Sequence, residues 1–377
     1  MPEQPDTASA GDPEAVGVPA APLLNPALRR LWRDDTTVQL GLDTDPAMVI
    51  HAVDPAIRSL LSNLDGRRSA AEIVAGAVSD GHDAEAVFGL LGELRAAGAL
   101  LGGDPAGLAG LGGPTEIDRL GPDLASLSLL ARIGSPDATT RLRRRRSAQV
   151  VVHGATRVGV PLAATVAAAG VGRVGVVDSG SVLLADANPG GLLPADEDRP
   201  RRLAAHDALR RAAPTVDTSI APDHSPNLIV LCDPWPAEQA CASLHAAGTP
   251  HLLATVRETT GVVGPLVLPG RTACLRCVDL HRCDRDSAWP AMLAQLTGRA
   301  RRAADPLDGP LALLMAAVAA LSVLSFLDGA GGVGGEVPGG VRDASLELRL
   351  PDWKLRRRSW PPHPRCRCGA ARQARAG

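Results

Sequence analysis

The stretch that most constrains the fold of this chain is residues 147–178. Its first apolar run, Ala148 to Val152, predicts a buried parallel strand, since both faces of such a strand are covered. An Ala-rich helix is expected from about Val158 to Ala169, and a second strand, Val174 to Val177, leads to Asp178. Together these elements predict one βαβ unit, the core of a layered α/β fold.

The turn inside this unit departs from the pattern Gly-x-Gly-x-x-Gly, which cradles phosphate. Gly154 and Gly159 hold its first and last positions, and Thr156 holds the middle one. A glycine there normally lets the backbone approach phosphate without a side chain in the way. Asp178, 24 residues after Gly154, has the spacing of an acid that binds a ribose hydroxyl. The pattern predicts the fold and leaves open a scaffold that binds no nucleotide.

Composition and charge limit the classes of function. The 377 residues carry a net charge of −2, which gives no overall field to recruit nucleic acid or a membrane. No charged stretch followed by an apolar one suggests export, so we expect a cytoplasmic protein. Leu311 to Leu327 is uncharged but slightly short for a membrane span of about 20 residues, and a buried helix is expected.

The first part of the chain predicts a small separate domain. Residues 1–21, rich in Pro, Ala, Gly and acid, are expected to be disordered. Within residues 22–103, short strands at Thr37–Leu42 and Met48–Val53 precede three helices, one of which opens with the capping box Ser69 to Glu72. Two strands and three short helices in this segment indicate a winged-helix module.

Residues 104–146 predict a linker. They begin with Gly and Pro, include a short helix at Asp123 to Leu130, and end in a basic run formed by Arg141 and residues 143–146. Charge runs usually stay solvated, so we expect solvated linker here rather than a nucleic-acid patch.

The seven cysteines carry the metal signal. An odd number in a chain without an export signal argues against a disulfide framework. Cys274 and Cys277 form a CxxC pair, and Cys366 and Cys368 form a CxC pair. A CxxC in a turn is a common half of a tetrahedral zinc site.

Over residues 148–368, several segments together resemble the ThiF/MoeB superfamily. This superfamily has the fold of ubiquitin-activating and sulfur-carrier-activating enzymes. The segments are AAGVGRVGVVD in the βαβ unit, the strand LIVLCD, the stretch GPLVLPGRTACLRC, the late apolar helix and the strands before CRC. The resemblance implies a Rossmann-like α/β sheet with helices on both faces, and a homodimer. It also implies a structural zinc on Cys274, Cys277, Cys366 and Cys368.

Active members of this superfamily use ATP and Mg²⁺ to adenylate the C-terminal carboxylate of a small protein. Of their signature D-F-D-x-V-x-x-x-N-L-N-R-Q, this chain keeps Asp178 but has Gly180 and Pro189 where an acid and a phosphate-binding arginine belong. The resemblance therefore implies an eroded nucleotide site, which Arg157 would partly compensate. The residues expected around a nucleotide are Gly154, Thr156, Arg157, Gly159, Asp178 and Asp233. The candidate catalytic residues are Asp233, which matches the family's magnesium-binding acid, and Arg201, which lies near the position of the family's catalytic lysine.

Cys283 lies six residues past the CxxC pair. Some relatives use a cysteine in this loop as a transfer nucleophile. Nothing nearby except His281 is an evident activating base, so an incidental thiol is favoured.

Residues 22–103 also carry a resemblance. LDGRRSAAEIV followed by LLGELRAAGAL resembles the PqqD-like domain, which binds leader peptides in modified-peptide biosynthesis. In that family a peptide adds as a strand to the sheet edge and packs on the last helix, roles that Thr37–Leu42 and the Val87–Leu94 face would have here. More narrowly, ACLRCVDLHRCDRDSAWP resembles ThiF-like proteins with a PqqD-like domain that accompany YcaO-type cyclodehydratases, which make azoline rings in peptides.

Three hypotheses follow. The favoured one is a scaffold that binds a precursor peptide and presents it to a YcaO-type enzyme. The second is an adenylyltransferase that activates the C-terminus of a ubiquitin-like or sulfur-carrier protein. The third is a winged-helix regulator that senses a nucleotide, although Asp80, Asp83 and Glu85 after the second helix disfavour DNA.

Overall fold

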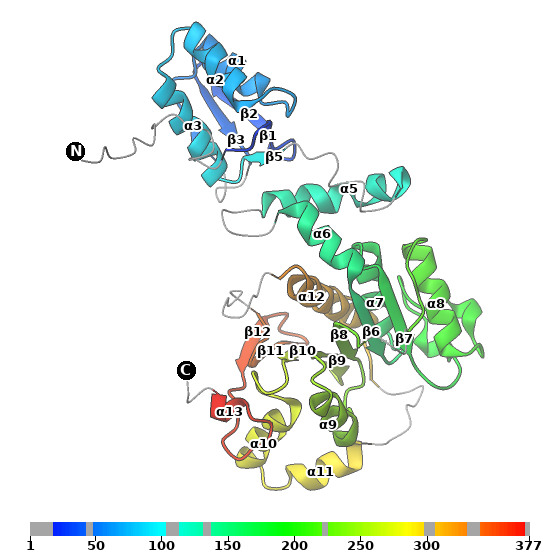
Figure 1. Cartoon of the computed structure of the whole chain (residues 1–377). Helices are drawn as coiled ribbons and strands as arrows, with labels where there is room; N and C mark the ends of the chain where they lie inside the picture. Colours follow the sequence, from blue (N-terminus) through cyan, green and yellow to red (C-terminus); the bar gives the residue numbers. More distant parts are fainter. Residues whose placement is uncertain are drawn as a thin grey trace, which may run out of the picture. The chain divides into compact units, whose positions relative to one another are not determined.

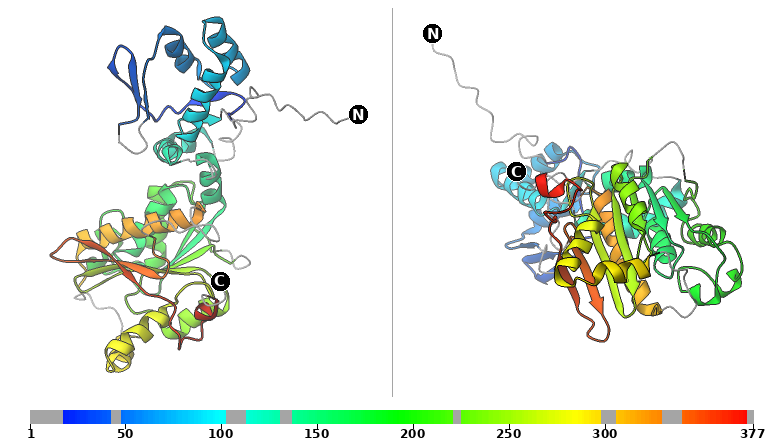
Figure 2. Two further views of the ribbon diagram at one scale, coloured as in Figure 1. Left: turned by 90° about the vertical axis from the view of Figure 1, so that its left-hand side faces the viewer. Right: turned by 90° about the horizontal axis from the view of Figure 1, so that it is seen from below.

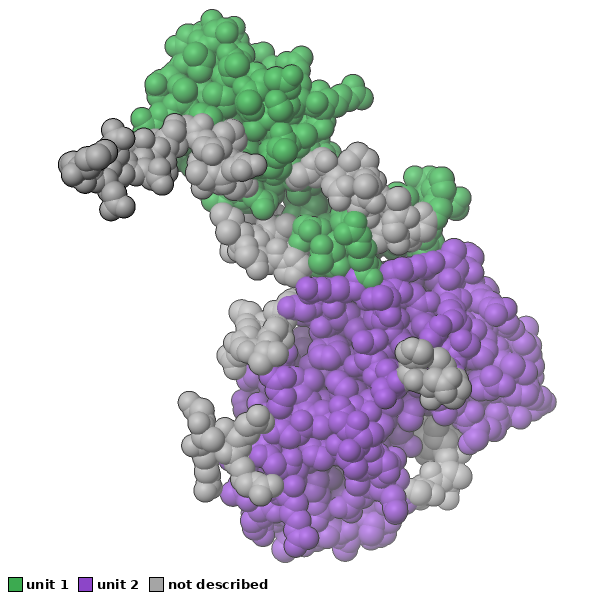
Figure 3. Space-filling view, in the orientation of Figure 1, with its two compact units in different colours: residues 1–143 green, residues 144–377 purple. Residues whose placement is uncertain are grey.

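The computed structural model describes residues 18–42, 48–102, 113–130, 137–220, 225–297, 306–329 and 340–373. The chain divides into two compact units, residues 1–143 and residues 144–377 (Figure 3). Each unit has its own hydrophobic core.

The first unit has a three-stranded antiparallel sheet in the order β2-β3-β4, followed by three helices (Figure 1). A separate pair, β1 with β5, joins the two ends of this segment. The bounds are β1 (Pro22–Leu24), β2 (Arg30–Asp34), β3 (Thr37–Leu40), β4 (Met48–Ile50), α1 (Pro55–Asn63), α2 (Ala70–Ser79), α3 (Ala84–Ala96) and β5 (Leu100–Gly102).

Each of the three helices begins at a side-chain cap, and one of these caps is the predicted capping box. Asp54 and Asp83 each accept a backbone N–H of the first turn of α1 and α3. Ser69 and Glu72 form the reciprocal capping box of α2. These local signals are confirmed because each is satisfied within four residues of chain.

The expected acceptor strand for a peptide, Thr37–Leu42, is wrong. It corresponds to β3, which is hydrogen-bonded to β2 on one side and to β4 on the other, and all four of its residues are buried. On the expected helix face, Val87, Leu91 and Leu94 are also buried. Within the described part of this sheet, the unpaired edges belong to β2 and β4.

Two stretches expected to lack packing are structured. Of residues 1–21, Val18 is buried and the carbonyl of Ala20 accepts the N–H of Ala70, while residues 1–17 lie outside the described residues. The expected linker forms α5 (Pro114–Leu129) and α6 (Ala138–Ser147).

The basic run in α6 is solvated only in part, because Arg143 and Arg144 are exposed whereas Arg141 and Arg145 are buried. The buried Arg145 donates through Nε and Nη2 to both carboxylate oxygens of Asp328, each at 2.7 Å. Arg144 donates to the backbone carbonyl of Asp328 at 2.8 Å. Asp328 ends a helix of the second unit, so these arginines neutralise a helix C-terminus and its cap.

The second unit is built on a seven-stranded sheet in the order β12-β11-β10-β9-β8-β6-β7. The strands from β7 to β9 are parallel, and those from β9 to β12 are antiparallel. The segment Gly261–Pro269 forms a hairpin with β9 and pairs on its other side with β11. The bounds are β6 (Gln149–His153), α7 (Gly159–Ala168), β7 (Arg173–Val177), η1 (Leu184–Asp186), η2 (Pro194–Asp196), α8 (Arg201–Ala212), β8 (Leu228–Leu231), α9 (Glu238–Ala246), β9 (His251–Arg257), β10 (Thr260–Val267), α10 (Leu275–Arg285), α11 (Trp289–Leu296), α12 (Gly309–Leu327), β11 (Ala344–Arg349), β12 (Leu355–Ser359) and α13 (Ala370–Gln373).

The parallel strands are covered on both faces. Val150 and Val152 point into the core with α7, α8 and α12, whereas Val151 and Leu253 pack on the opposite side, next to Leu244 of α9. The two views of Figure 2 show α12 on one face of the sheet and α9 to α11 on the other. The predicted alternation of strands and helices is therefore confirmed in this unit.

Helix α12 is, within the described residues, the one helix long and apolar enough to cross a membrane. Its buried side, which includes Leu311, Met315 and Val323, packs against α7, β9 and β10. Leu321 on the other side is 70% exposed. The expectation of a buried helix is thus confirmed for one face of α12.

Candidate functional site

The turn after β6 lies where a phosphate-binding loop is expected. Gly154 has a φ of +105°, a conformation that favours glycine. The hydroxyl of the buried Thr156 turns back on the start of α7 and accepts the N–H of Val158 at 3.2 Å and of Gly159 at 2.9 Å. Backbone amides at a helix N-terminus are the groups that bind phosphate. Here two of them already have an acceptor within the protein.

Gly159 has a structural reason to be glycine. A Cβ atom at this position would lie 2.0 Å from the carbonyl oxygen of Gly154 and 3.3 Å from Sγ of Cys232. The retained glycine therefore lets α7 pack closely on the turn and on β8, and it is required with or without a nucleotide.

The acid at the end of β7 is engaged by its own protein. One oxygen of Asp178 accepts the N–H of Ala155 at 2.6 Å, and the other lies 3.7 Å from Nη1 of Arg201. Arg201, the first residue of α8, is buried and donates through Nη2 to Asp186 at 2.8 Å. The sequence analysis missed Asp186, which lies in the short helix η1 and belongs to no motif.

Arg157 lies at the same edge of the sheet, but its guanidinium is already hydrogen-bonded within the protein. Its Nη1 donates to the carbonyl of Leu307 at 2.9 Å, and its carbonyl accepts from Asn188 at 3.1 Å. The Nε atom of Arg157 is buried, and no hydrogen-bond partner for it lies within the described part of the chain.

Asp233 follows β8 and is exposed, with its carboxylate accepting the N–H of Trp235 at 2.8 Å. A cavity of about 210 Å³ adjoins the turn, lined by Thr156, Arg157 and Pro234 among others. Sites for small-molecule ligands usually measure about 300–1,000 Å³. The space at this edge of the sheet is small for a nucleoside triphosphate.

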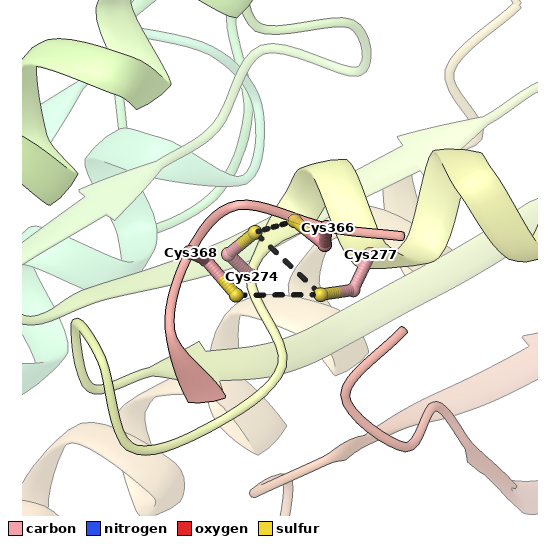
Figure 4. Close-up of side chains that lie close together, drawn as sticks. All are labelled: Cys274, Cys277, Cys366 and Cys368. Atoms are coloured by element: carbon pink, nitrogen blue, oxygen red, sulfur yellow. Dashed lines mark hydrogen bonds between the residues drawn. The ribbon is translucent and has the colours of Figure 1, made fainter. Parts of the chain in front are cut away.

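The four cysteines of the CxxC and CxC pairs converge at one point (Figure 4). The Sγ–Sγ distances are 3.6 Å for Cys274–Cys366, 3.6 Å for Cys277–Cys368 and 3.8 Å for Cys274–Cys277. Zn–S bonds of about 2.3 Å in a tetrahedron place the sulfurs about 3.8 Å apart. These four residues, called the four-cysteine centre below, fit a single tetrahedral metal ion.

The local structure prepares the four-cysteine centre for a cation. Cys274 precedes the first residue of α10, and Cys277 lies in the first turn of that helix. The hydrogen bond from Cys274 lowers the pKa of the Cys277 thiol to about 5, whereas burial raises the pKa of Cys366 to about 11. The lowered pKa of Cys277 favours its thiolate, the form that ligates metal.

The segment that carries Cys366 and Cys368 is held to α10 by two histidines. His363 accepts the N–H of Arg365 on Nδ1 at 3.2 Å, so its proton lies on Nε2 and points to Asp284 at 2.8 Å. His281 meets the carbonyl of Pro361 at 2.8 Å. The side chains of His281, Asp284 and His363 also lie close enough together for a metal, but the hydrogen bonds already use both nitrogens of His363, Nε2 of His281 and the Asp284 carboxylate.

Cys283 and the remaining cysteines lie outside the centre. Cys283 is half-buried on α10, and neither Cys232 nor Cys241 belongs to the group of converging thiols. Burial raises the pKa of the Cys241 thiol to about 11, which suppresses the reactive thiolate form.

Comparison with known proteins places the fold. The model of the ThiF family matches residues 126–368. The structure of Escherichia coli MccB with ATP has a TM-score of 0.66 at 13% identity, covering 92% of this chain and 99% of that one. The structure of the microcin C7 biosynthetic enzyme MccB with N-formylated MccA gives the same values. PaaA has a TM-score of 0.65 at 17% identity, covering 89% of this chain and 99% of its own.

No curated protein matches this chain in sequence. At these low identities the solved structures establish the fold alone. The family model, however, spans more than half of the chain, from α5 through the sheet to the last of the converging cysteines, and the chain therefore belongs to the ThiF family.

Proposed function

We propose that this ThiF-family protein is a scaffold that binds a precursor peptide and presents it to a YcaO-type cyclodehydratase. The main support for a scaffold without adenylation activity is that the Thr156 hydroxyl accepts the N–H groups of Val158 and Gly159, which would otherwise bind phosphate. The Asp178–Arg201–Asp186 network adds to it. A triphosphate would have to displace these internal bonds before it gained its own.

The proposed peptide site is in residues 22–103, as a PqqD-like domain. A peptide can add as a strand only where a sheet edge is unpaired. Strand β2 offers such an edge, and its Trp32, 42% exposed, is stacked on the guanidinium of Arg58 at 3.7 Å. Strand β4 offers the other. An exposed aromatic beside an unpaired backbone is a surface that an extended peptide can cover.

Two features of the similar structures support this proposal. MccB has been solved with MccA, and it is named a microcin C7 biosynthetic enzyme. By analogy of fold, we propose that this chain also handles a peptide. We further propose a homodimer in the cytoplasm, as the family resemblance implies.

The four-cysteine centre is proposed to hold a structural zinc. Thiolate sets of this kind leave no open position for substrate, and a bound ion of this class contributes on the order of 10 kcal/mol to folding. The residues that would hold it are Cys274, Cys277, Cys366 and Cys368. Their own role is to fix the segment after β12 to the start of α10.

The test is reconstitution with a precursor peptide and a YcaO-type enzyme, both of which the proposal expects to be encoded near this chain. The full chain should bind the peptide by calorimetry without nucleotide and should increase the rate of azoline formation. Arg30→Pro in β2 and Val49→Pro in β4 identify the edge used, because the N–H of each residue points away from β3 and proline removes that donor. If neither variant changes peptide affinity while both remain folded, strand addition is wrong.

A second candidate is an adenylyltransferase. It is favoured by Asp233, whose carboxylate is exposed and carries only one hydrogen bond within the described residues. ATP–pyrophosphate exchange that depends on a carrier protein or peptide, and that disappears in Asp233→Asn, would establish this activity and overturn the scaffold proposal.

A further inference from the structure

The second unit has another cavity, larger than the one at the nucleotide position. It measures about 810 Å³ and lies between the β9–β11 face of the sheet and the helices α9, α10 and α11. Its volume falls within the range of about 300–1,000 Å³ that ligand sites occupy. Residues that define its chemistry are Trp235, Leu253, Arg257, Leu293, Arg282 and Trp360.

Arg257 provides the cavity with a cation that lacks a partner. It is the last residue of β9, and its guanidinium lies 4.2 Å from the ring centroid of Trp235. Its Nε donates to the carbonyl of Pro234 at 3.0 Å, and within the described ranges no carboxylate forms an ion pair with it. Burial, with the charge of Arg282 acting in the same direction, lowers the pKa of Arg257 to about 9, against the opposing charges of Asp279, Glu347 and Asp233. A buried cation of this kind is stabilised when an anion binds.

The second arginine of the cavity is held among aromatic rings. The guanidinium of Arg282 lies 4.7 Å from the ring centroid of Trp289 and 5.7 Å from that of Trp360. Its one acidic neighbour at ion-pair distance in the described chain is Asp279, at 3.6 Å. Burial raises the pKa of Asp279, which weakens its ability to neutralise both arginines.

The walls of the cavity are aromatic and aliphatic. Trp235 and Trp360 line the cavity, and the ring of Trp289 lies 5.8 Å from that of Trp235. Leu253 from β9 and Leu293 from α11 face the same space. Such a surface favours apolar side chains around a single charged group.

We propose that this cavity binds a carboxylate-bearing ligand with apolar side chains, the size of a short peptide segment. The carboxylate would pair with the free Nη atoms of Arg257 in the fork geometry that guanidinium groups favour. The apolar part would pack between the tryptophans and the two leucines. The carboxylate can come from a peptide C-terminus or from an acidic side chain. This site is separate from the 210 Å³ cavity and does not depend on the proposed peptide site of the first unit.

Intrinsic tryptophan fluorescence of the full chain tests the proposal. The probes are acetyl-Leu-Leu as the free acid, the same dipeptide as the C-terminal amide, and acetyl-Glu-Leu amide. The free acid should bind about tenfold more tightly than acetyl-Leu-Leu amide, since only the acid pairs with Arg257. Whether acetyl-Glu-Leu amide matches the acid or the amide identifies the source of the carboxylate.

Substitutions locate the charge. Arg257→Gln should abolish the difference between acid and amide, and Arg257→Lys should restore part of it. Arg276→Gln is the matched control, because Arg276 also lines the cavity but is half-exposed and already lies 3.6 Å from Glu238. It should leave both affinities unchanged.

Ala294→Phe provides a test that does not depend on the arginine. Ala294 is an exposed residue of α11 on the lining, so a larger side chain there narrows the cavity without disturbing the core. It should weaken both probes at an unchanged melting temperature. Equal binding of acid and amide, a difference that persists in Arg257→Gln, or unchanged binding in Ala294→Phe would each overturn the proposal.

Discussion

The four-cysteine centre and the nucleotide position belong to the same unit, and both derive from family motifs, but their ligating groups are in opposite conditions. At the centre, four sulfurs converge at distances that suit one ion. At the nucleotide position, the Thr156 hydroxyl accepts the amides of Val158 and Gly159. Asp178 accepts the N–H of Ala155, and Arg201 pairs with Asp186. The difference teaches that the presence of a motif residue does not establish that its binding group is free.

The two positions also tolerate change differently. The second cysteine pair has CxC in place of CxxC, yet its segment lies after β12 and can adjust until the sulfurs meet. The phosphate turn has no such freedom, because Gly159 allows no Cβ and the turn is fixed to β7 and β8. One side chain at Thr156 is enough to occupy its donors.

The largest expected effect is at the four-cysteine centre. Replacing Cys274 and Cys277 by Ser should remove about one zinc per chain and a large part of the stability of the second unit, because such ions contribute on the order of 10 kcal/mol. Metal analysis and thermal unfolding measure both. Cys283→Ser, on the same helix, should keep the metal. If the double variant retained full zinc, these two cysteines would not be ligands, and the contrast between the four-cysteine centre and the nucleotide position would be wrong.

The next effect is at the nucleotide position itself. Asp186→Asn leaves Arg201 buried with a weakened partner and should cost about 3–5 kcal/mol in the free energy of unfolding. Asp207→Asn breaks the exposed pair with Arg199 and should cost about 0–1 kcal/mol. Urea unfolding compares the two. If Asp186→Asn lowers the free energy of unfolding no more than Asp207→Asn does, the Arg201–Asp186 pair does not stabilise the fold, and Arg201 is available to bind a ligand.

A smaller effect concerns the occupied amides. Thr156→Gly frees the N–H groups of Val158 and Gly159 and should raise ATP affinity about tenfold over a weakly binding parent. Thr156→Ser keeps the hydroxyl and should bind ATP as weakly as the parent. Calorimetry gives the three dissociation constants. Tight ATP binding by the unaltered chain would contradict the comparison drawn above.

The smallest effect is a pH dependence next to the centre. The hydrogen bond from His363 lowers the pKa of Asp284 from 3.8, and Arg365 acts in the same direction. Its contribution to stability is therefore present above the unfolded pKa of about 3.9 and is lost as the pH falls through the lower folded value. Denaturant midpoints measured between about pH 5 and pH 2 should fall less steeply in Asp284→Asn than in the parent. Asp286→Asn should follow the parent curve.

The sheet of the second unit could be predicted because its signals are local. Apolar runs such as Ala148–Val152 identify strands buried on both faces, and the cysteine spacing identifies the centre. Strand β2 escaped because four of its five residues are exposed and leave no apolar pattern. Without it, β3 could not be recognised as the central strand of its sheet.

The remaining misses involve partners far apart in the chain. Arg145 and Asp328 are separated by 183 residues, and a basic run gives no sign of which of its members is buried. Arg257 and Arg282 enter one cavity only because β9 and α10 pack together with α9 and α11. Such groups follow from tertiary packing, which no local pattern encodes.

The two halves of the four-cysteine centre are separated by 91 and 92 residues along the chain. A ribosome must therefore synthesise α11, α12, β11 and β12 after it has made Cys277 and before it makes Cys366. A nascent chain that stalls in this interval has only two of the four converging cysteines. On the proposed zinc assignment, capture of the metal would mark a molecule whose synthesis has passed the final strand of the sheet.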